Sequence, residues 1–153
     1  MQSRPPFMKA HLMWRGGTFT VQRRFRNDSK LNNKREAQAL VTIYKVCPAS
    51  AWREAERQGV YRGSADDQRD GFIHLSKASQ LEGTLARHFA GQNGLFLIAI
   101  DADILGDAVR WEPSRNRQLF PHLYGDLDPG AVLKVMDIHT KPDGTHSIPD
   151  LAP

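Results

Sequence analysis

The sequence predicts an α+β fold, a small single domain of five to six mixed strands with two main helices. Three observations support this prediction. The chain has 153 residues, the usual length of one domain with one core. Short β-branched or apolar runs recur between turn-forming residues, and Leu95–Ile100 is the clearest of them. Two segments, 49–58 and 77–90, carry apolar side chains at helical spacing.

Residues 1–40 differ from the rest of the chain in charge and in pattern. They hold nine Lys and Arg against two acidic residues, whereas residues 41–153 hold twelve against fifteen. Their apolar residues follow neither a helical nor a strand period. We therefore expect a basic, disordered extension at 1–40, a globular domain at 41–140 and a surface tail at 141–153. Only the extension has the charge to attract nucleic acid.

The globular part opens with a predicted strand and helix. Residues 41–46 are β-branched and aromatic, with the alternation of a strand. Residues 49–58 follow as a helix that ends at Gly59, since glycine suits a helix C-terminus. Residues 62–71 are rich in charge and in turn-forming residues, which predicts a loop.

The next predicted elements surround a histidine and a serine. We expect a strand at 72–75 and then a helix at 77–90 capped by Ser76, with a buried stripe of Leu81, Leu85 and Phe89. The unbroken apolar run at 95–100 predicts a strand buried on both faces. The remaining elements are a turn at 101–106, a strand at 108–112, a polar loop at 113–118, a rigid aromatic loop at 121–125 and a last strand at 131–138.

Composition excludes several kinds of protein. The single cysteine, Cys47, excludes an internal disulfide and a zinc site built from cysteines within one chain. No apolar run approaches the roughly 18–20 residues that span a bilayer, so we expect a cytoplasmic protein with no membrane partner. Phosphate-binding glycine loops and the common hydrolase motifs are missing from the sequence. We predict no metal site.

Side chains capable of chemistry concentrate in three stretches: 66–76, 110–115 and 120–125. In the first, His74 and Ser76 are two residues apart, so a strand places them on one side. The simpler interpretations are a capping serine, a surface pair of Glu112 with Arg115, and a packed turn in the third stretch. Three such stretches in one small domain favour a shared polar cleft instead. Its predicted lining is Asp70, His74, Ser76, Glu112, Arg115, His122 and Tyr124.

These stretches also carry a resemblance to a known family. The sequence resembles the bacterial family called domain of unknown function 952, from about residue 41 to 138. The motifs that carry the resemblance are Tyr44-Lys45, Trp52, Gly59-Val60-Tyr61, Asp70-Gly71-Phe72-Ile73-His74-Leu75-Ser76, Gln80-Leu81, Trp111-Glu112 and Phe120-Pro121-His122-Leu123-Tyr124-Gly125.

The resemblance implies a fold similar to that of ADP-ribosyltransferases, which bind NAD in a cleft between two small sheets. By this analogy His74 holds a ribose, Ser76 supports it, and Glu112 polarises it, while Tyr61 or Tyr124 stacks on the nicotinamide. The implied partner is a small nucleotide-like molecule, with NAD as the candidate cofactor. We assign no oligomeric state.

Two alternatives belong to other classes. The first is a non-catalytic module that binds a nucleotide or a partner through the same cleft. The second is a two-histidine phosphoesterase, in which His74 and His122 act as acid and base. The segment His74-Leu75-Ser76 fits the phosphoesterase pattern once, but Tyr124 stands where a second Ser or Thr is expected.

Overall fold

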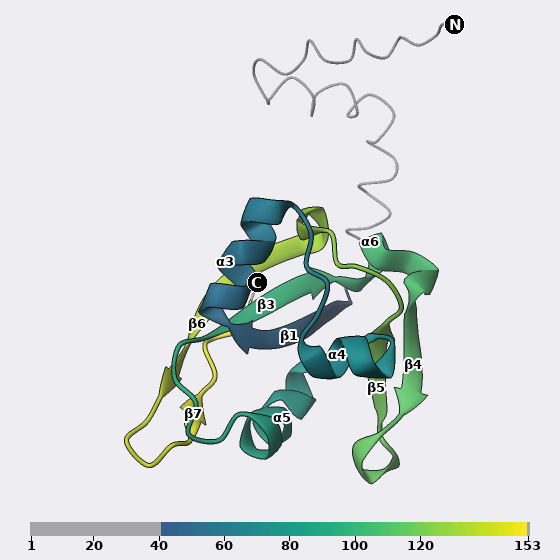
Figure 1. The fold of residues 1–153 in the computed structure, drawn as a ribbon. Helices are drawn as coiled ribbons and strands as arrows, with labels where there is room; N and C mark the ends of the chain where they lie inside the picture. The colour runs from purple at the N-terminus through teal and green to yellow at the C-terminus, as the bar shows by residue number, and fades with distance from the viewer. Residues whose placement is uncertain (1–40, 153) are drawn as a thin grey trace, which may run out of the picture. The chain divides into compact units, whose positions relative to one another are not determined.

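The computed structural model describes residues 41–152, so the predicted extension at 1–40 lies outside the described residues. The strands form two antiparallel sheets, ordered β1-β3-β6-β7 and β2-β5-β4 (Figure 1). The strands are β1 (Thr42–Pro48), β2 (Ile73–His74), β3 (Leu95–Asp101), β4 (Val109–Pro113), β5 (Leu119–Leu123), β6 (Val132–Thr140) and β7 (His146–Ser147). The α-helices are α3 (Ala49–Gln58), α4 (Ala65–Asp70), α5 (Leu81–His88) and α6 (Ala102–Leu105).

The strand β3 is buried on both faces, as its apolar run predicts. Ile98 and Ile100 of β3 join a cluster with Trp52 of α3, whereas Leu95 and Leu97 join a second cluster with α5. The helices α3 and α5 therefore cover opposite faces of the four-stranded sheet (Figure 1). The α+β class and the strand at 95–100 are confirmed.

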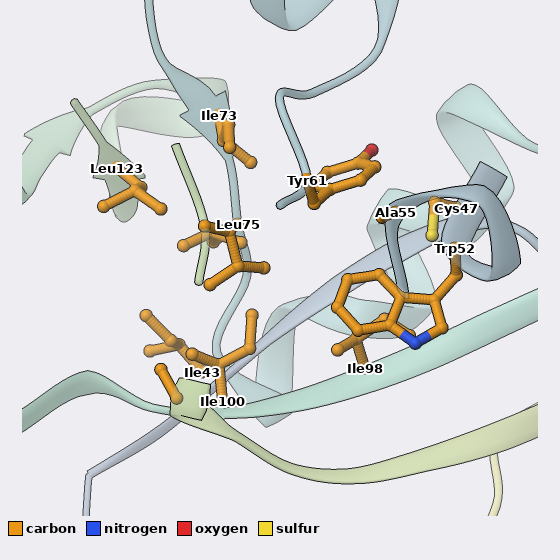
Figure 2. Packing of buried hydrophobic residues seen from close by; sticks show 12 residues of the cluster. Ile43, Cys47, Trp52, Ala55, Tyr61, Ile73, Leu75, Ile98, Ile100 and Leu123 are labelled. Atoms are coloured by element: carbon orange, nitrogen blue, oxygen red, sulfur yellow. The ribbon is translucent and has the colours of Figure 1, made fainter. Parts of the chain in front are cut away.

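The three-stranded sheet adds its own apolar face to the first of these clusters. Ile73 and Leu123 pair in register and are both buried there (Figure 2). Because successive side chains of a strand point to opposite faces, the neighbouring pair, His74 and His122, lies on the other face of the sheet. The core thus fixes which side of the sheet carries the histidines.

The prediction of a loop at 62–71 is wrong, because residues 65–70 form the helix α4. Ser64 accepts a hydrogen bond from the backbone N–H of Asp67, and the Asp67 carboxylate accepts one from the N–H of Ser64. This reciprocal capping box starts a helix, and Gly71 ends it in the left-handed conformation (φ 87°). The same serines and aspartates that favour turns also cap helices, which explains the error.

The predicted helix at 77–90 is shorter than expected and Ser76 does not cap it. Ser76 instead pairs its backbone with Tyr44, and its hydroxyl lies 3.0 Å from that of Thr84. Residues 78–80 form a single 3-10 turn before α5 begins at Leu81.

Two further predictions about the chain's second half also fail. The first three residues of the predicted aromatic loop at 121–125 belong to the strand β5, whose central position in its sheet supplies backbone partners on both edges. The predicted tail at 141–153 contains β7, and its Ile148 and Leu151 pack against the core. Residues 41–152 therefore hold seven strands rather than five or six. No helix in this range is long and apolar enough to cross a membrane.

Candidate active site

Two histidines lie side by side on one face of the three-stranded sheet. His74 of β2 and His122 of β5 are directly paired, and their ring centroids are 5.6 Å apart. Each ring has its Nδ1 atom 2.7 Å from a carboxylate oxygen, of Asp67 for His74 and of Glu112 for His122. A carboxylate at this distance fixes both the orientation and the tautomer of an imidazole ring.

His74 lies between two carboxylates that α4 supplies. Its Nδ1 meets Asp67 Oδ1, and its Nε2 lies 3.1 Å from Asp70 Oδ2. Asp67 and Asp70 are three residues apart, so they lie on one face of the helix. A carboxylate oxygen therefore lies within 3.1 Å of each ring nitrogen of His74.

Asp67 is the anchor of this arrangement. Its side chain is 2% exposed, and its Oδ2 atom lies 2.8 Å from the ammonium nitrogen of Lys45, which is also buried. Lys45 donates a second hydrogen bond to the backbone carbonyl of His74 at 3.1 Å. Burial raises the pKa of Asp67, but hydrogen bonds from His74 and Lys45 and the Lys45 charge hold it well below its usual range. Asp67 is therefore ionised and completely partnered.

His122 has a different set of partners. Glu112 Oε1 lies 2.7 Å from His122 Nδ1 and also accepts a hydrogen bond from the Tyr124 hydroxyl at 2.9 Å. These two hydrogen bonds lower the pKa of Glu112, and the same carboxylate raises the pKa of Tyr124. The His122 side chain is 7% exposed, yet no other residue of the described domain forms a hydrogen bond with its Nε2 atom. Because an ionised carboxylate only accepts, His122 donates its Nδ1–H to Glu112, and its buried Nε2 atom has no hydrogen-bond partner within residues 41–152.

An aromatic ring lies at the centre of the site. Phe72 stacks on His122 with ring centroids 4.1 Å apart, and it also contacts His74 at 4.6 Å and Tyr124 at 5.2 Å. The Arg110 guanidinium lies 4.4 Å from the centroid of Tyr124. Phe72 and Arg110 thus already contact the ring of Tyr124.

The two imidazoles differ in their surroundings. His74 has a carboxylate beside each ring nitrogen, whereas the Nε2 atom of His122 has no hydrogen-bond partner within residues 41–152. Proton transfer to and from a substrate needs one acid and one base. Within residues 41–152 no group of three or more His, Cys, Asp or Glu is arranged to hold a metal ion.

The structure brings together five of the predicted site residues, namely His74, Asp70, His122, Glu112 and Tyr124. Arg115 lies beside them, with its guanidinium 4.8 Å from the ring centroid of Phe120.

Two predicted residues lie in other surroundings. Tyr61 is 4% exposed in the core, where its ring contacts Trp52 (Figure 2). Ser76 is also buried, and its hydroxyl is occupied by Thr84. The described contacts link neither residue to the imidazole rings.

Four residues of the site were missed by sequence reasoning, namely Lys45, Asp67, Phe72 and Arg110. Two of them carry a readable signal. Lys45 alternates with Ile43 and Cys47 on the inward face of a strand, and a lysine there needs a buried anion. Asp67 stands three residues after Ser64, the spacing of a capping box.

Comparison with known families and structures gives a consistent result. The family model described as "Protein of unknown function (DUF952)" matches residues 46–135. The chain belongs to this family. The DUF952 match covers all the site residues except Lys45, which immediately precedes it.

Two solved structures of protein CC0527 from Caulobacter crescentus are similar to this DUF952 chain. Its crystal structure is 42% identical in sequence, with a TM-score of 0.67 over 69% of this chain and 93% of that one. Its solution structure is also 42% identical, with a TM-score of 0.63 over 69% of this chain and 91% of that one. Both come from a structural genomics programme. No curated protein matches the chain.

Proposed function

We propose that this DUF952 protein binds a nucleotide-like ligand at the paired histidines and catalyses acid–base chemistry at its phosphate ester. The observation that carries the proposal is the pair itself, two opposed imidazoles that carboxylates hold through Nδ1. Of the interpretations that the sequence leaves open, this geometry gives most support to the two-histidine enzyme.

In the proposed reaction His122 is the base and His74 the acid. The Nε2 atom of His122 takes the proton of an attacking hydroxyl, of water or of the ligand's own ribose, as that oxygen bonds to phosphorus. The phosphorus–oxygen bond to the leaving group breaks, and His74 Nε2 gives that oxygen its proton. Asp70, whose side chain is 34% exposed, turns away from His74 Nε2 for this step.

The charges around the pair favour a small, partly neutral reacting group. Asp67, Asp70 and Glu112 place three carboxylates at the histidines. Lys45 pairs with Asp67, Arg69 pairs with Asp70, and the charge of Arg110 acts on Glu112, so the carboxylates are offset without any excess of positive charge. A phosphodiester with one negative charge suits this balance better than a dianionic phosphate monoester.

Transfer of ADP-ribose from NAD is the second candidate. It is favoured by Glu112 and Tyr124, which lie with His74 around one aromatic ring. In this scheme Glu112 polarises the ribose and His74 positions it. A binding module without catalysis is the third, and turnover distinguishes it from both enzymes.

The test uses the full chain with four ligands: NAD, ADP-ribose, a 2′-phosphorylated nucleotide and a 2′,3′-cyclic phosphate. Thermal shift and calorimetry measure binding, and product analysis measures turnover. His74→Gln and His122→Gln are compared with His139→Gln, which changes an exposed histidine of β6. We expect the cyclic phosphate to be opened by the native chain and the His139 variant only.

The other outcomes separate the candidates. Conversion of NAD that requires Glu112 and not His122 would replace this proposal with the ADP-ribosyl scheme. Binding without turnover, weakened in the two histidine variants, would leave the binding module. Each variant is first checked for an intact thermal transition, because His122 is buried.

A further inference from the structure

Two arginines and a histidine lie where α5 approaches the loop between β4 and β5. Figure 1 shows α5 and the tip of this hairpin at the same end of the domain. Arg115, in the hairpin tip, lies against α5. Its Nη2 atom is 3.0 Å from the point where a Cβ on Gly83 would stand. Arg87 follows Gly83 by four residues and so lies on the same face of the helix, and His88 comes next.

Arg87 and Arg115 carry charges that no acidic side chain pairs with in the described domain, since none of the ion pairs within residues 41–152 includes Arg87, His88 or Arg115. His88 lies within reach of both charges. Burial lowers the pKa of His88, and the charges of Arg115, Arg87 and His74 lower it further, with only Asp66 opposing them. Like charges held together without counter-ions make a positive surface that an anion stabilises.

The cluster lies close to the reacting pair. The Arg115 guanidinium covers the ring of Phe120, which precedes His122 by two residues on β5. Two residues along a strand correspond to about 7 Å and bring both side chains to the same face. Phe120 is also paired with Glu112 in the sheet register.

We propose that Arg87, His88 and Arg115 form a second anion subsite, which binds a further phosphate of the ligand that reacts at His74 and His122. This inference rests on the proposed function for the identity of the ligand. It specifies the substrate class as a nucleotide with at least two phosphate groups. The reacting phosphate lies at the imidazoles, where carboxylates limit the charge that is accepted, and the second phosphate lies on the unpaired cations.

The first experiment tests the subsite without any nucleotide. Inorganic pyrophosphate is titrated into the full chain, and the ring protons of His88 and the Nε–H groups of the arginines are followed by NMR. We expect saturable shifts and a rise in the pKa of His88, because a bound anion opposes the repulsion from Arg115 and Arg87. Arg115→Gln and Arg87→Gln should each weaken binding by about fivefold or more.

The control is Lys134→Gln, which removes one exposed positive charge from β6 and should leave the affinity unchanged. Equal affinity in the native chain and in both arginine variants would overturn the subsite, as would shifts that spread over the surface without affecting His88.

The second experiment identifies the source of the second phosphate. A 2′,3′-cyclic mononucleotide is compared with the same nucleotide carrying a 5′-phosphate, and with ADP-ribose as a pyrophosphate. We expect the 5′-phosphate to improve affinity at least about fivefold in the native chain and not in Arg115→Gln. A gain for ADP-ribose alone would assign the subsite to pyrophosphates.

The two proposals fail in different ways. If the arginine variants lose turnover but still bind a ligand with two phosphates more tightly than a ligand with one, the subsite alone is refuted. If the native chain shows this difference in affinity but turns over none of the ligands, the proposed reaction alone is refuted.

Discussion

Asp67→Asn is expected to destabilise the domain by about 3–5 kcal/mol, because it removes the anion from a buried ion pair. The Asp67 and Lys45 side chains are 2% and 8% exposed, so the lysine charge would remain buried without a partner. The native Asp67 carboxylate accepts hydrogen bonds from four donor groups. An asparagine would present an amide N–H₂ group, itself a donor, to some of these donors. Since domains are stable by about 5–15 kcal/mol, this loss is a large share of the total.

Urea unfolding of the single and double variants measures the effect. The matched control is Asp66→Asn on the same helix, where the side chain is 71% exposed, and it should cost under about 1 kcal/mol. Adding Lys45→Met to Asp67→Asn removes the unpaired charge and should restore more than about 1 kcal/mol. A loss no larger than that of the control, or no recovery in the double variant, would refute the reasoning.

The same carboxylate governs acid stability. The pKa of Asp67 is lower in the folded chain than in the unfolded one, where it is near the model-peptide value of about 3.9. Its stabilisation is therefore fully present above that pH and is lost as the pH falls through the folded-state pKa. In Asp67→Asn the unfolding free energy should decline less steeply below about pH 4 than in the native chain.

Three other predictions follow from single contacts. Burial raises the pKa of Cys47 to about 11, so a thiol reagent at pH 7 should label it only when the chain unfolds, and rapid labelling of the native chain would contradict the burial. Gly83→Ala should raise the free energy of unfolding by up to about 1 kcal/mol, because alanine has the higher helix propensity and the flexible end of Arg115 can move aside; a lower free energy of unfolding than that of the native chain would show that Arg115 cannot move. Tyr124→Phe removes a hydrogen bond to the Glu112 carboxylate and should raise the pKa of Glu112 in an NMR titration, whereas an unchanged value would show that this bond is not formed.

Hydrophobic patterning predicted the parts of the fold that depend on burial. The alternation at 41–46 and the apolar run at 95–100 correspond to β1 and β3, and the helix at 49–58 ends at Gly59 as expected. Patterning fails where polar residues build structure through their own hydrogen bonds, as in α4. It also fails at β5, where Pro121 and His122 interrupt the apolar pattern although both are buried.

The sequence predicted only part of the site, because the rest of it depends on tertiary packing. The chemistry of single residues pointed to His74, His122 and Glu112, because histidines and acidic residues in turn-rich stretches are candidate site residues in any fold. Lys45 and Asp67 are 22 residues apart and meet only through tertiary packing. No local pattern could show that pair, although a lysine on the inward face of a strand implies that such a partner exists.

The geometry of the histidine pair depends on the hydrophobic core. His74 faces His122 because Ile73 faces Leu123 one position away, and both of those side chains are buried. A slip of one residue between β2 and β5 would place one histidine on the core side of the sheet and separate the pair. Such a slip would bury an imidazole and expose an apolar side chain, so burial and pairing favour the same register. The residues that stabilise this sheet therefore also hold the two imidazoles beside each other.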